Sequence, residues 1–381
     1  MSDHKLMQTP KSLEIDITNN CNLRCKYCSH FESAGEVARD LPAADWLKFF
    51  EECSRCAILD LTICGGEPFF RPDLIELING IIKNRMRFSI LSNGTLITDE
   101  IAAFLASTKR CSSVQVSIDG SIPTTHDACR GPGSFQKALA GLLNLRKFKI
   151  PATVRVTIHR HNVRELDNIA KMLIEEIGLS GFSTNSASHL GECQKNAEIT
   201  QLTPDERYIA MEALLRLNQK YNNCIGANAG PLSEAKFWLK MIQAKRDGLP
   251  GLPGAGFLTS CGGVFSKLGV RADGVITPCG QMPHIELGHI NKDSLKDIWQ
   301  NHPELKRLRE RRQTPLSDFA FCKDCEYIPY CRGGCPALAY TLTGGENQPS
   351  PDCCLRNYLK ADGKLPDEKL LLGSEECACH A

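Results

Sequence analysis

Short apolar segments rich in β-branched residues recur along the first half of the chain. They occupy residues 13–18, 59–64, 87–92, 113–118 and 152–158, with a weaker one at 181–185. Amphipathic helical patterns separate them, for example over residues 46–53 and 166–177. Strands that alternate with helices predict a parallel sheet built from βαβ units. Periodicity leaves two α/β architectures open, a partial TIM-like barrel and an open doubly wound sheet.

The pattern changes after about residue 200. Residues 203–246 predict two helices, the first opened by a capping box of Thr203 and Glu206. A turn-rich linker follows at 250–256, and then a cysteine- and glycine-rich region with few periodic runs. We therefore expect four units. They are a barrel (1–202), a helical connector (203–259), a small metal-held domain (260–360) and a loose tail (361–381).

Charge and targeting patterns narrow the function classes. The 45 basic and 44 acidic side chains leave a formal net charge of +1, which argues against a nucleic-acid binder and a membrane-surface protein. No apolar run is long enough to cross a bilayer, and the first ten residues lack a signal-peptide core. We expect a cytoplasmic protein with no nucleic-acid or membrane partner.

Cysteine is the anomaly of the composition, with 20 in 381 residues. A disulfide scaffold is usually a short secreted chain, so zinc sites and iron–sulfur clusters are the remaining explanations. The thiols gather in one group near the start and a second near the end. The first group is Cys21, Cys25 and Cys28, and the second is Cys322, Cys325, Cys331 and Cys335.

The polar and glycine-bearing motifs follow the predicted strands directly. TNNCNLRCKYC, GGEPFF, NGT and DGS come after strands one to four. The carboxyl ends of parallel strands share one edge, where α/β active sites form. The spacing of Cys21, Cys25 and Cys28 suits three irons of a [4Fe–4S] cluster and leaves the fourth iron open for a small ligand. A zinc site completed by His30 is the alternative.

The run CNLRCKYC, with Tyr27 before its third cysteine, resembles the signature of the radical S-adenosylmethionine (SAM) enzymes. The resemblance covers about residues 12–190 and implies a partial (β/α)6 TIM-like barrel. It implies a [4Fe–4S] cluster that binds SAM and cleaves it to methionine and a 5′-deoxyadenosyl radical. It assigns no catalytic residue beyond the cluster. The implied cofactor-binding residues are Gly65, Gly66, Glu67, Pro68, Asn93, Ser117 and Arg130, with Glu67 facing the SAM ammonium, and Ser117 and Arg130 its carboxylate.

The cysteines of the second half resemble the SPASM extension, which carries two auxiliary [4Fe–4S] clusters. By that resemblance, one cluster takes Cys261, Cys279 and Cys335. The other takes Cys322, Cys325, Cys331 and Cys353, and Cys354 is an equally good last ligand. A zinc ribbon is the alternative explanation of this run.

Three departures from relatives matter. A further cysteine often precedes the position of Cys261, but here the stretch GLPGAGFLTS has none. The first auxiliary cluster is therefore expected to keep an open iron or to use a substitute such as Cys224. Gly280 stands where sulfatase-maturing relatives carry an acidic residue, which disfavours formylglycine formation. Strand one begins near residue 12, so an N-terminal leader-binding domain is not expected, and a separate protein is the candidate for that role.

We therefore predict a radical SAM/SPASM enzyme that modifies a peptide or peptide-derived substrate by cross-linking, epimerisation or oxidation. The alternative substrate is a tetrapyrrole or quinone precursor in cofactor biosynthesis. A zinc-held or redox-carrier protein without catalysis is a third hypothesis, but a carrier has no need of the GGEP motif or of the Ser117 and Arg130 pair. The expected partners are the substrate, a leader-binding protein and an electron donor such as flavodoxin or ferredoxin.

Overall fold

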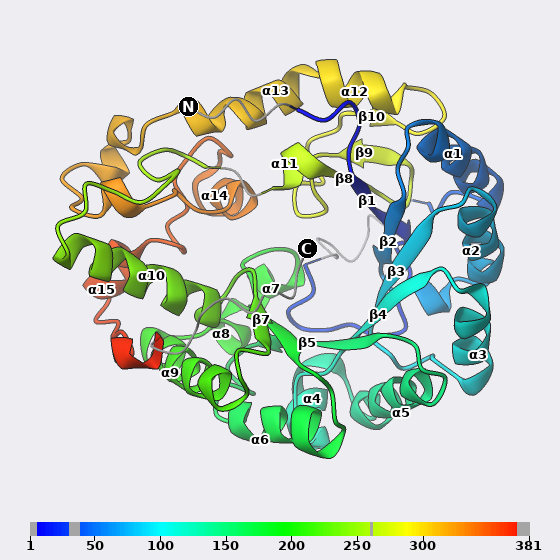
Figure 1. Ribbon diagram of the computed structural model, residues 1–381, viewed down its shortest axis with the longest axis horizontal. Coiled ribbons are helices and arrows are strands. Elements are labelled where there is room, and N and C mark those ends of the chain that lie inside the picture. Colours follow the sequence, from blue (N-terminus) through cyan, green and yellow to red (C-terminus); the bar gives the residue numbers. More distant parts are fainter. Residues whose placement is uncertain (1–5, 30–38, 260–261, 372–381) are drawn as a thin grey trace.

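The strands of the computed structural model, which describes residues 6–29, 39–259 and 262–371, form one curved sheet (Figure 1). Within these residues the sheet has ten strands in the order β10-β9-β8-β1-β2-β3-β4-β5-β6-β7. Neighbours from β8 through β1 to β7 are parallel, and β8, β9 and β10 pair antiparallel. The strands are β1 (Ser12–Thr18), β2 (Asp60–Gly65), β3 (Arg87–Ser92), β4 (Cys111–Ser117), β5 (Ala152–Ile158), β6 (Phe182–Ser186), β7 (Ile225–Ala227), β8 (Lys267–Val270), β9 (Val275–Thr277) and β10 (Gly288–His289).

Helices cover the outer face of the arc (Figure 1). The first six predicted strands and the helices between them are confirmed, and the sheet is the barrel-like arc of β1–β6 extended at both edges. The helices are α1 (Ala43–Arg55), α2 (Leu74–Lys83), α3 (Asp99–Thr108), α4 (Pro123–Arg130), α5 (Ser134–Lys147), α6 (Leu166–Ala170), α7 (Glu192–Lys195), α8 (Ala197–Thr200), α9 (Pro204–Lys220), α10 (Pro231–Arg246), α11 (Gly263–Ser266), α12 (Leu295–Asn301), α13 (Pro303–Glu310), α14 (Pro336–Thr343) and α15 (Leu355–Lys360).

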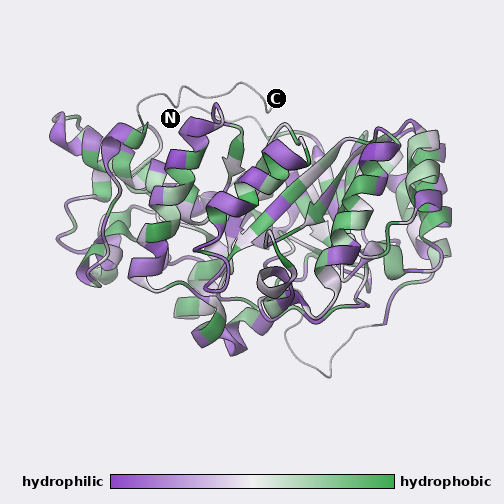
Figure 2. Cartoon of the chain, turned by 90° about the horizontal axis from the view of Figure 1, so that it is seen from below, coloured by the Kyte–Doolittle hydropathy of each residue, from purple (hydrophilic) through white to green (hydrophobic). Residues whose placement is uncertain are grey.

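The core lies between the sheet and these helices. Trp46, Phe49, Phe50 and Cys53 of α1 are all buried, as their spacing predicts. Alternate residues of each strand are buried beneath them, such as Leu13, Ile15 and Ile17 of β1. Hydrophobic positions on the helices accordingly form patches rather than covering each helix (Figure 2). Burial of this apolar surface stabilises the barrel without any metal.

The helix after β5 departs from the expected regular pattern. Residues 166–177 begin as α6 and continue as a π-helical stretch, η2 (Lys171–Glu176).

The capping box of α9 is confirmed. The Thr203 hydroxyl accepts from the Glu206 backbone N–H, and the Glu206 carboxylate accepts from the Thr203 backbone N–H. Within the described residues, no helix has the length and apolarity needed to cross a bilayer.

The expected unit boundaries do not appear as breaks in the sheet. The connector contributes β7, and β8 of the cysteine-rich region pairs with β1, with Ser12 opposite Lys267. One short helix, η1 (Pro68–Phe70), follows β2 in the barrel. Beyond β10 the chain forms further short helices, which include η3 (Arg311–Gln313), η4 (Leu316–Asp318), η5 (Ala320–Cys322), η6 (Ile328–Tyr330) and η7 (Glu368–Leu371).

The expected loose tail is docked over its described part. Leu365, Leu370 and Leu371 pack against the main core, and Glu368 forms an ion pair with Arg246 of α10. Residues 372–381, with Cys377 and Cys379, lie outside the described residues.

Candidate active site

The loop after β1 carries the first cysteine group to the carboxyl edge of the sheet. Cys21, Cys25 and Cys28 are free thiols and half-buried. The backbone N–H of Leu23 donates to the Cys21 sulfur at 3.4 Å, and Asn93 Nδ2 lies 3.8 Å from the same sulfur. N–H groups aimed at sulfur stabilise thiolate and cluster charge, so the surroundings of Cys21 suit a cluster ligand.

Two glycines let the loop after β2 lie directly on the cysteine loop. A Cβ on Gly66 would stand 2.2 Å from the Asn20 carbonyl oxygen, and one on Gly65 would stand 2.3 Å from that of Thr18. Gly65 also has a φ of 117°, which disfavours any side chain. The close approach allows two backbone hydrogen bonds. The Gly66 N–H donates to the Thr18 carbonyl at 2.8 Å, and the Glu67 N–H donates to the Asn20 carbonyl at 2.9 Å. The GGEP motif therefore fixes the backbone that carries Cys21.

The Glu67 side chain is held by donors from inside the protein. It is fully buried, accepts from the Asn93 N–H at 2.7 Å and from the Ser92 hydroxyl at 2.8 Å, and also accepts from the Phe69 N–H. Burial raises the pKa of this carboxyl to about 7. Glu67 thus joins the loops after β2 and β3 and positions Asn93, while its contact with the SAM ammonium stays a prediction.

Asn93 links three of the predicted loops. Its Nδ2 donates to Asn22 Oδ1 at 2.9 Å, and its Oδ1 accepts from the backbone N–H of Thr95 at 2.9 Å. Asn22 in turn donates to the Thr95 hydroxyl at 2.8 Å. The polar residues after β1 and β3 therefore form one connected group beside Cys21, as their positions at strand ends predict.

Arg130 and Asp119 form a buried ion pair behind Cys25. Their closest atoms, Nε and Oδ2, are 2.5 Å apart, and both side chains are buried. The Tyr27 hydroxyl donates to the same carboxylate, and Arg130 Nη1 lies 3.9 Å from the Cys25 sulfur. Burial raises the pKa of Cys25, and the Arg130 charge opposes that rise. Arg130 thus places a fixed cation beside a metal-ligand candidate.

Further buried groups complete this network, and the sequence predicted no role for Thr157 and Asn162 among them. Asp119 Oδ1 accepts from the Thr157 N–H at 2.8 Å, and Asn162 donates to the Asp119 carbonyl at 2.9 Å. His159 stacks on Tyr27, with ring centroids 5.3 Å apart, and its Nδ1 is 3.8 Å from the Cys129 sulfur. No spacing rule marks these single residues, but DGS and the strand end at 158 place them at this edge.

Ser117 and Pro68, the two remaining predicted cofactor residues, lie at the end of β4 and at the start of η1. Ser117 is half-buried at the end of β4, opposite Arg155 of β5. Pro68 is buried and opens η1 directly behind Glu67. Together with Gly65, Gly66, Asn93 and Arg130, these residues come from the ends of β2, β3 and β4 and of α4. The edge that the sequence predicted therefore does gather the candidate residues.

The second cysteine group lies in short helices and turns beyond α13. Cys322 is buried, and Cys325, Cys331, Cys335, Cys353 and Cys354 are half-buried free thiols. The charges of Cys331, Cys354 and Cys325 all contribute to raising the pKa of Cys322, after burial, to about 11. Cys322, Cys325, Cys331 and Cys354 all line one small cavity, so these four thiols form one group.

Cys279 and Cys261 complete the candidate auxiliary ligands. Cys279 is half-buried after β9, and its sulfur accepts from the Gln281 N–H at 3.5 Å. The same Gln281 donates to Ser29 of the first cysteine loop at 3.4 Å. This contact joins the two cysteine-bearing regions. Cys261 and His30 lie outside the described residues.

In residues 6–29, 39–259 and 262–371, no three His, Cys, Asp or Glu side chains form a group that could hold one metal ion. A zinc ion binds all its thiolate ligands at about 2.3 Å from one point. A [4Fe–4S] cluster instead bonds each thiolate to a different iron.

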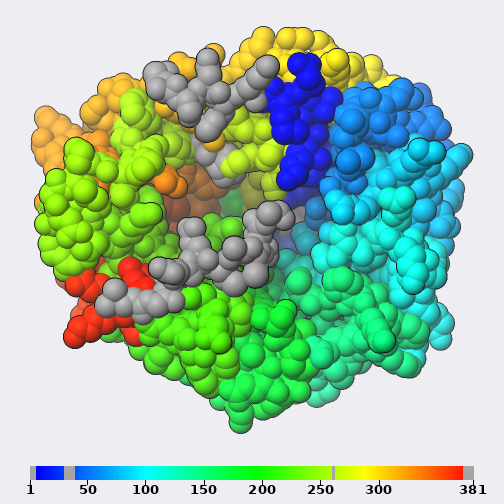
Figure 3. Space-filling model, in the orientation of Figure 1, coloured from blue at the N-terminus to red at the C-terminus, as the bar shows by residue number. Residues whose placement is uncertain are grey.

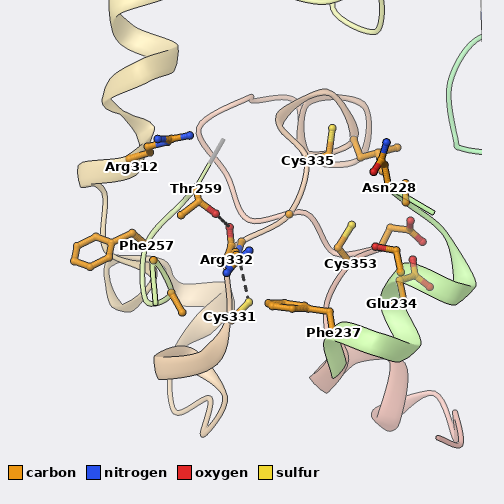
Figure 4. Close-up of a pocket in the computed structure, with 18 of the residues that line it drawn as sticks. Asn228, Glu234, Phe237, Phe257, Thr259, Arg312, Cys331, Arg332, Cys335 and Cys353 are labelled. Carbon is orange, nitrogen blue, oxygen red and sulfur yellow. Dashed lines mark hydrogen bonds between the residues drawn. The ribbon is translucent and has the colours of Figure 1, made fainter. Parts of the chain in front are cut away.

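A large cavity lies between α10, α13 and the second cysteine group. Its volume is about 1220 Å³, and Cys331, Cys335 and Cys353 line it. Figure 4 shows these thiols with Phe237, Glu234 and Arg312 around the same space. The surface is hollowed near the centre of the face in Figure 3. A drug-sized ligand fills about 300–1,000 Å³, so this cavity has room for a larger substrate.

Comparison with known families agrees with this geometry. Residues 15–173 match the Radical SAM superfamily, and residues 261–326 match SPASM, an iron-sulfur cluster-binding domain. The first match spans the loops that carry Cys21, Gly66, Asn93 and Arg130. The second includes the loop of Cys279 and the thiols Cys322 and Cys325.

Curated relatives cover most of the chain. An AdoMet-dependent heme synthase of Methanosarcina barkeri is 28% identical over 359 residues, which is 92% of this chain and 98% of that protein. The mycofactocin maturase MftC of Mycobacterium tuberculosis is 29% identical over 355 residues, 91% of this chain and 83% of that one. Streptococcus suis SuiB, solved with its precursor peptide SuiA, shares the fold, with a TM-score of 0.69 and 16% identity over 92% of this chain and 77% of SuiB.

Proposed function

Because this chain is a radical SAM enzyme with a SPASM iron–sulfur domain, we propose that it cleaves SAM reductively and abstracts hydrogen from a peptide substrate. The modification class is peptide maturation, by cross-linking, epimerisation or oxidation. The observation that carries the proposal is the assembly of Cys21, Cys25 and Cys28 with the GGEP loop, Asn93 and Arg130 at one sheet edge.

A [4Fe–4S] cluster held by the first three thiols would supply the electron that cleaves SAM to methionine and a 5′-deoxyadenosyl radical. The residues of the chain bind and orient. Gly65 and Gly66 hold the loop backbone close, and Asn93 fixes the turn beside Cys21. Arg130 keeps a positive charge near Cys25, and Asp119 keeps Arg130 in place.

The SPASM domain binds iron–sulfur clusters, and we propose two auxiliary clusters there. Their candidate ligands are Cys261, Cys279, Cys322, Cys325, Cys331, Cys335 and the Cys353–Cys354 pair. Several of these thiols line the 1220 Å³ cavity. That arrangement supports a cavity in which substrate lies within reach of an auxiliary cluster.

A peptide substrate is supported by the maturase MftC and by SuiB, which was solved with a precursor peptide. The proposal also includes an electron donor such as flavodoxin or ferredoxin and a separate leader-binding protein. The donor is tested in the SAM cleavage assay described below. Reduced flavodoxin should support formation of 5′-deoxyadenosine when it replaces the chemical reductant dithionite.

A tetrapyrrole substrate is the second candidate. The heme synthase of Methanosarcina barkeri matches over 92% of this chain. Arg309, Arg312 and Arg332 line the cavity, and Arg309 Nη2 is buried with no hydrogen-bond partner among the described residues. Cations in a large cavity suit the carboxylates of a tetrapyrrole, so this observation favours the alternative.

Anaerobic reconstitution followed by a SAM cleavage assay tests the reaction. The loaded protein should form 5′-deoxyadenosine after reduction, and Cys25→Ala should fall to the level of a protein-free control. Cys64→Ala is the matched control, because Cys64 lies in β2 near the same edge, interacts with the Thr62 carbonyl and Asp16, and belongs to neither group of candidate ligands. Equal cleavage by both variants would refute the assignment of the first cluster.

Incubation with candidate substrates separates the two substrate classes. Short peptides encoded next to the gene should change mass in the presence of SAM and reductant, whereas an iron-containing tetrapyrrole precursor should not. A mass change in the tetrapyrrole alone would replace the peptide proposal with the alternative.

A further inference from the structure

Cys353 and Cys354 are adjacent in the chain, but they face different surroundings. Cys354 caps the N-terminus of α15 in an extended conformation, with φ −92° and ψ 109°. Cys353, in contrast, lies in the turn that precedes this helix. The two thiols therefore leave the backbone from different local conformations.

Cys354 lies with Cys322, Cys325 and Cys331 around one small cavity, which Phe321 and other apolar side chains also line. Cys353 lines this cavity and the 1220 Å³ cavity, whereas Cys354 lines only the small one of these two. Cys354 is therefore the member of the adjacent pair that completes a set of four thiols with Cys322, Cys325 and Cys331.

Cys353 faces Cys335 instead. The backbone N–H of Cys335 hydrogen-bonds to the Cys353 sulfur, and both thiols line the 1220 Å³ cavity (Figure 4). Gly334 permits this approach, because a Cβ there would stand 3.1 Å from the Cys353 Cβ and 3.4 Å from its sulfur. Gly334 also has a φ of 82°, so a side chain at this position would be strained.

Arg207 offsets the negative charges of the two carboxylates near Cys353. Asp352, the neighbour of Cys353, and the buried Glu234 both pair with Arg207, at 3.1 and 2.8 Å. The guanidinium therefore offsets the carboxylates that would oppose a thiolate next to them.

The other substitute ligand, Cys224, lies at the wrong edge of the sheet. It directly precedes β7, which runs parallel to β6, and its carbonyl oxygen contacts Gly181 just before β6. Both residues mark the amino edge, opposite the loops with the candidate site. The loop after Cys279, in contrast, reaches the helix that follows Cys335, since His284 stacks on Tyr340 of α14 at 3.7 Å.

We propose that the adjacent pair is divided between the two auxiliary clusters, so that Cys353 ligates the cluster of Cys335 and Cys354 ligates that of Cys322, Cys325 and Cys331. This inference rests on the proposed auxiliary clusters. Each cysteine ligates iron as a thiolate and loses its proton to solvent. The first auxiliary cluster then gains the thiolate that the stretch before Cys261 does not provide, and it need not keep an open iron.

Iron content and EPR spectra of the reduced, reconstituted full-length chain test this division. Cys335→Ala and Cys325→Ala identify the signals of the two auxiliary clusters. Cys353→Ser should shift the signal that Cys335→Ala removes and leave the other unchanged. Cys354→Ser should do the reverse. Serine keeps a weaker oxygen ligand, so a shift without loss of iron separates ligation from misfolding.

Paired variants sharpen the test through iron counts. Cys335→Ala with Cys353→Ala should lose about four irons, because both ligands serve one cluster, whereas Cys325→Ala with Cys353→Ala should lose about eight. Cys111→Ala is the control for loss of a half-buried thiol on β4, and it should change neither signal.

Reversed iron losses, or a Cys353→Ser variant with both signals unchanged, would overturn the division. The test is independent of SAM cleavage. If the auxiliary signals follow the prediction but SAM is not cleaved, the proposed reaction fails and the ligand division stands.

Discussion

The barrel and the region around the second cysteine group use different sources of stability. Strands β1–β6 and their helices bury a continuous apolar core, including Trp46 and Phe88 at the centre. Residues 311–354 form short helices and turns. Their described apolar burial is a small cluster around Leu316 and Cys322 and a few side chains, such as Tyr330 and Ala337, that reach the main core. We propose that metal–thiolate bonds add to the stability of this region. By this proposal the cysteines of the barrel serve chemistry, whereas those of the second group also serve folding.

Removal of iron should have the largest effect, because it should destabilise the region of the second cysteine group and leave the barrel unchanged. We expect the apo-protein to exchange amide hydrogens in α14 and α15 about 100-fold faster than the loaded protein, which corresponds to about 3 kcal/mol of local stability. Exchange in β2–β5 should stay the same, because their core is apolar. Hydrogen exchange read by mass spectrometry measures both regions in one sample. Equal acceleration in the barrel would contradict the comparison.

Gly66→Ala tests the barrel, where we expect a loss of SAM cleavage. The added Cβ would stand 2.2 Å from the Asn20 carbonyl oxygen, so the cysteine loop has to shift. We expect SAM cleavage to fall about 10- to 100-fold, since displacement of about 1 Å has that effect at reacting groups. Gly345→Ala is the matched control, because its Cβ would meet nothing closer than Gln348 Cγ at 3.6 Å. Unchanged cleavage in Gly66→Ala would refute close packing as the role of the motif.

The smallest expected effect concerns the pH dependence of Glu67. Burial raises its pKa from 4.5 to about 7, so its contribution to stability is present below pH 4.5 and is lost as pH rises through about 7. Glu67→Gln lacks this titration. The stability of the parent relative to the variant should therefore be greater at pH 5 than at pH 8, by about 2 kcal/mol.

Denaturant unfolding of both proteins at the two pH values measures that difference. The pKa values of His126 and His159, lowered to about 4 by burial, give the opposite slope. Both histidines occur in parent and variant, so their effect cancels. An equal difference at pH 5 and pH 8 would mean that Glu67 keeps the same charge throughout.

The elements that sequence could predict were those with their own periodic signal. Strands β1–β6 and the buried face of α1 follow from local patterns, and so does the capping box of α9. Strands β7–β10 have two to four residues each and depend on pairing with distant strands. Residues this few carry no alternation that distinguishes a strand from a loop.

The site divides in the same way. The cysteine spacing and GGEP placed Cys21, Gly66 and Asn93 at one edge before any coordinates. The three donors around the Glu67 carboxylate were not predictable, because a motif gives the position of a carboxylate and not the groups that surround it. The network of Asp119 and His159 came from strands far apart in sequence, where no local signal joins them.

The pairing of β1 with β8 also governs how the chain is made. Glu14 and Lys267 are ion-pair partners 253 residues apart, so a ribosome adding about 5–20 residues per second needs roughly 10 to 50 s between them. During that interval β1 is an uncovered edge strand with free N–H and C=O groups, and the thiols of the first loop emerge beside it. A nascent chain in this state requires protection from aggregation and from oxygen until residue 270 has left the ribosome. Insertion of the first cluster is therefore best timed after the sheet has closed.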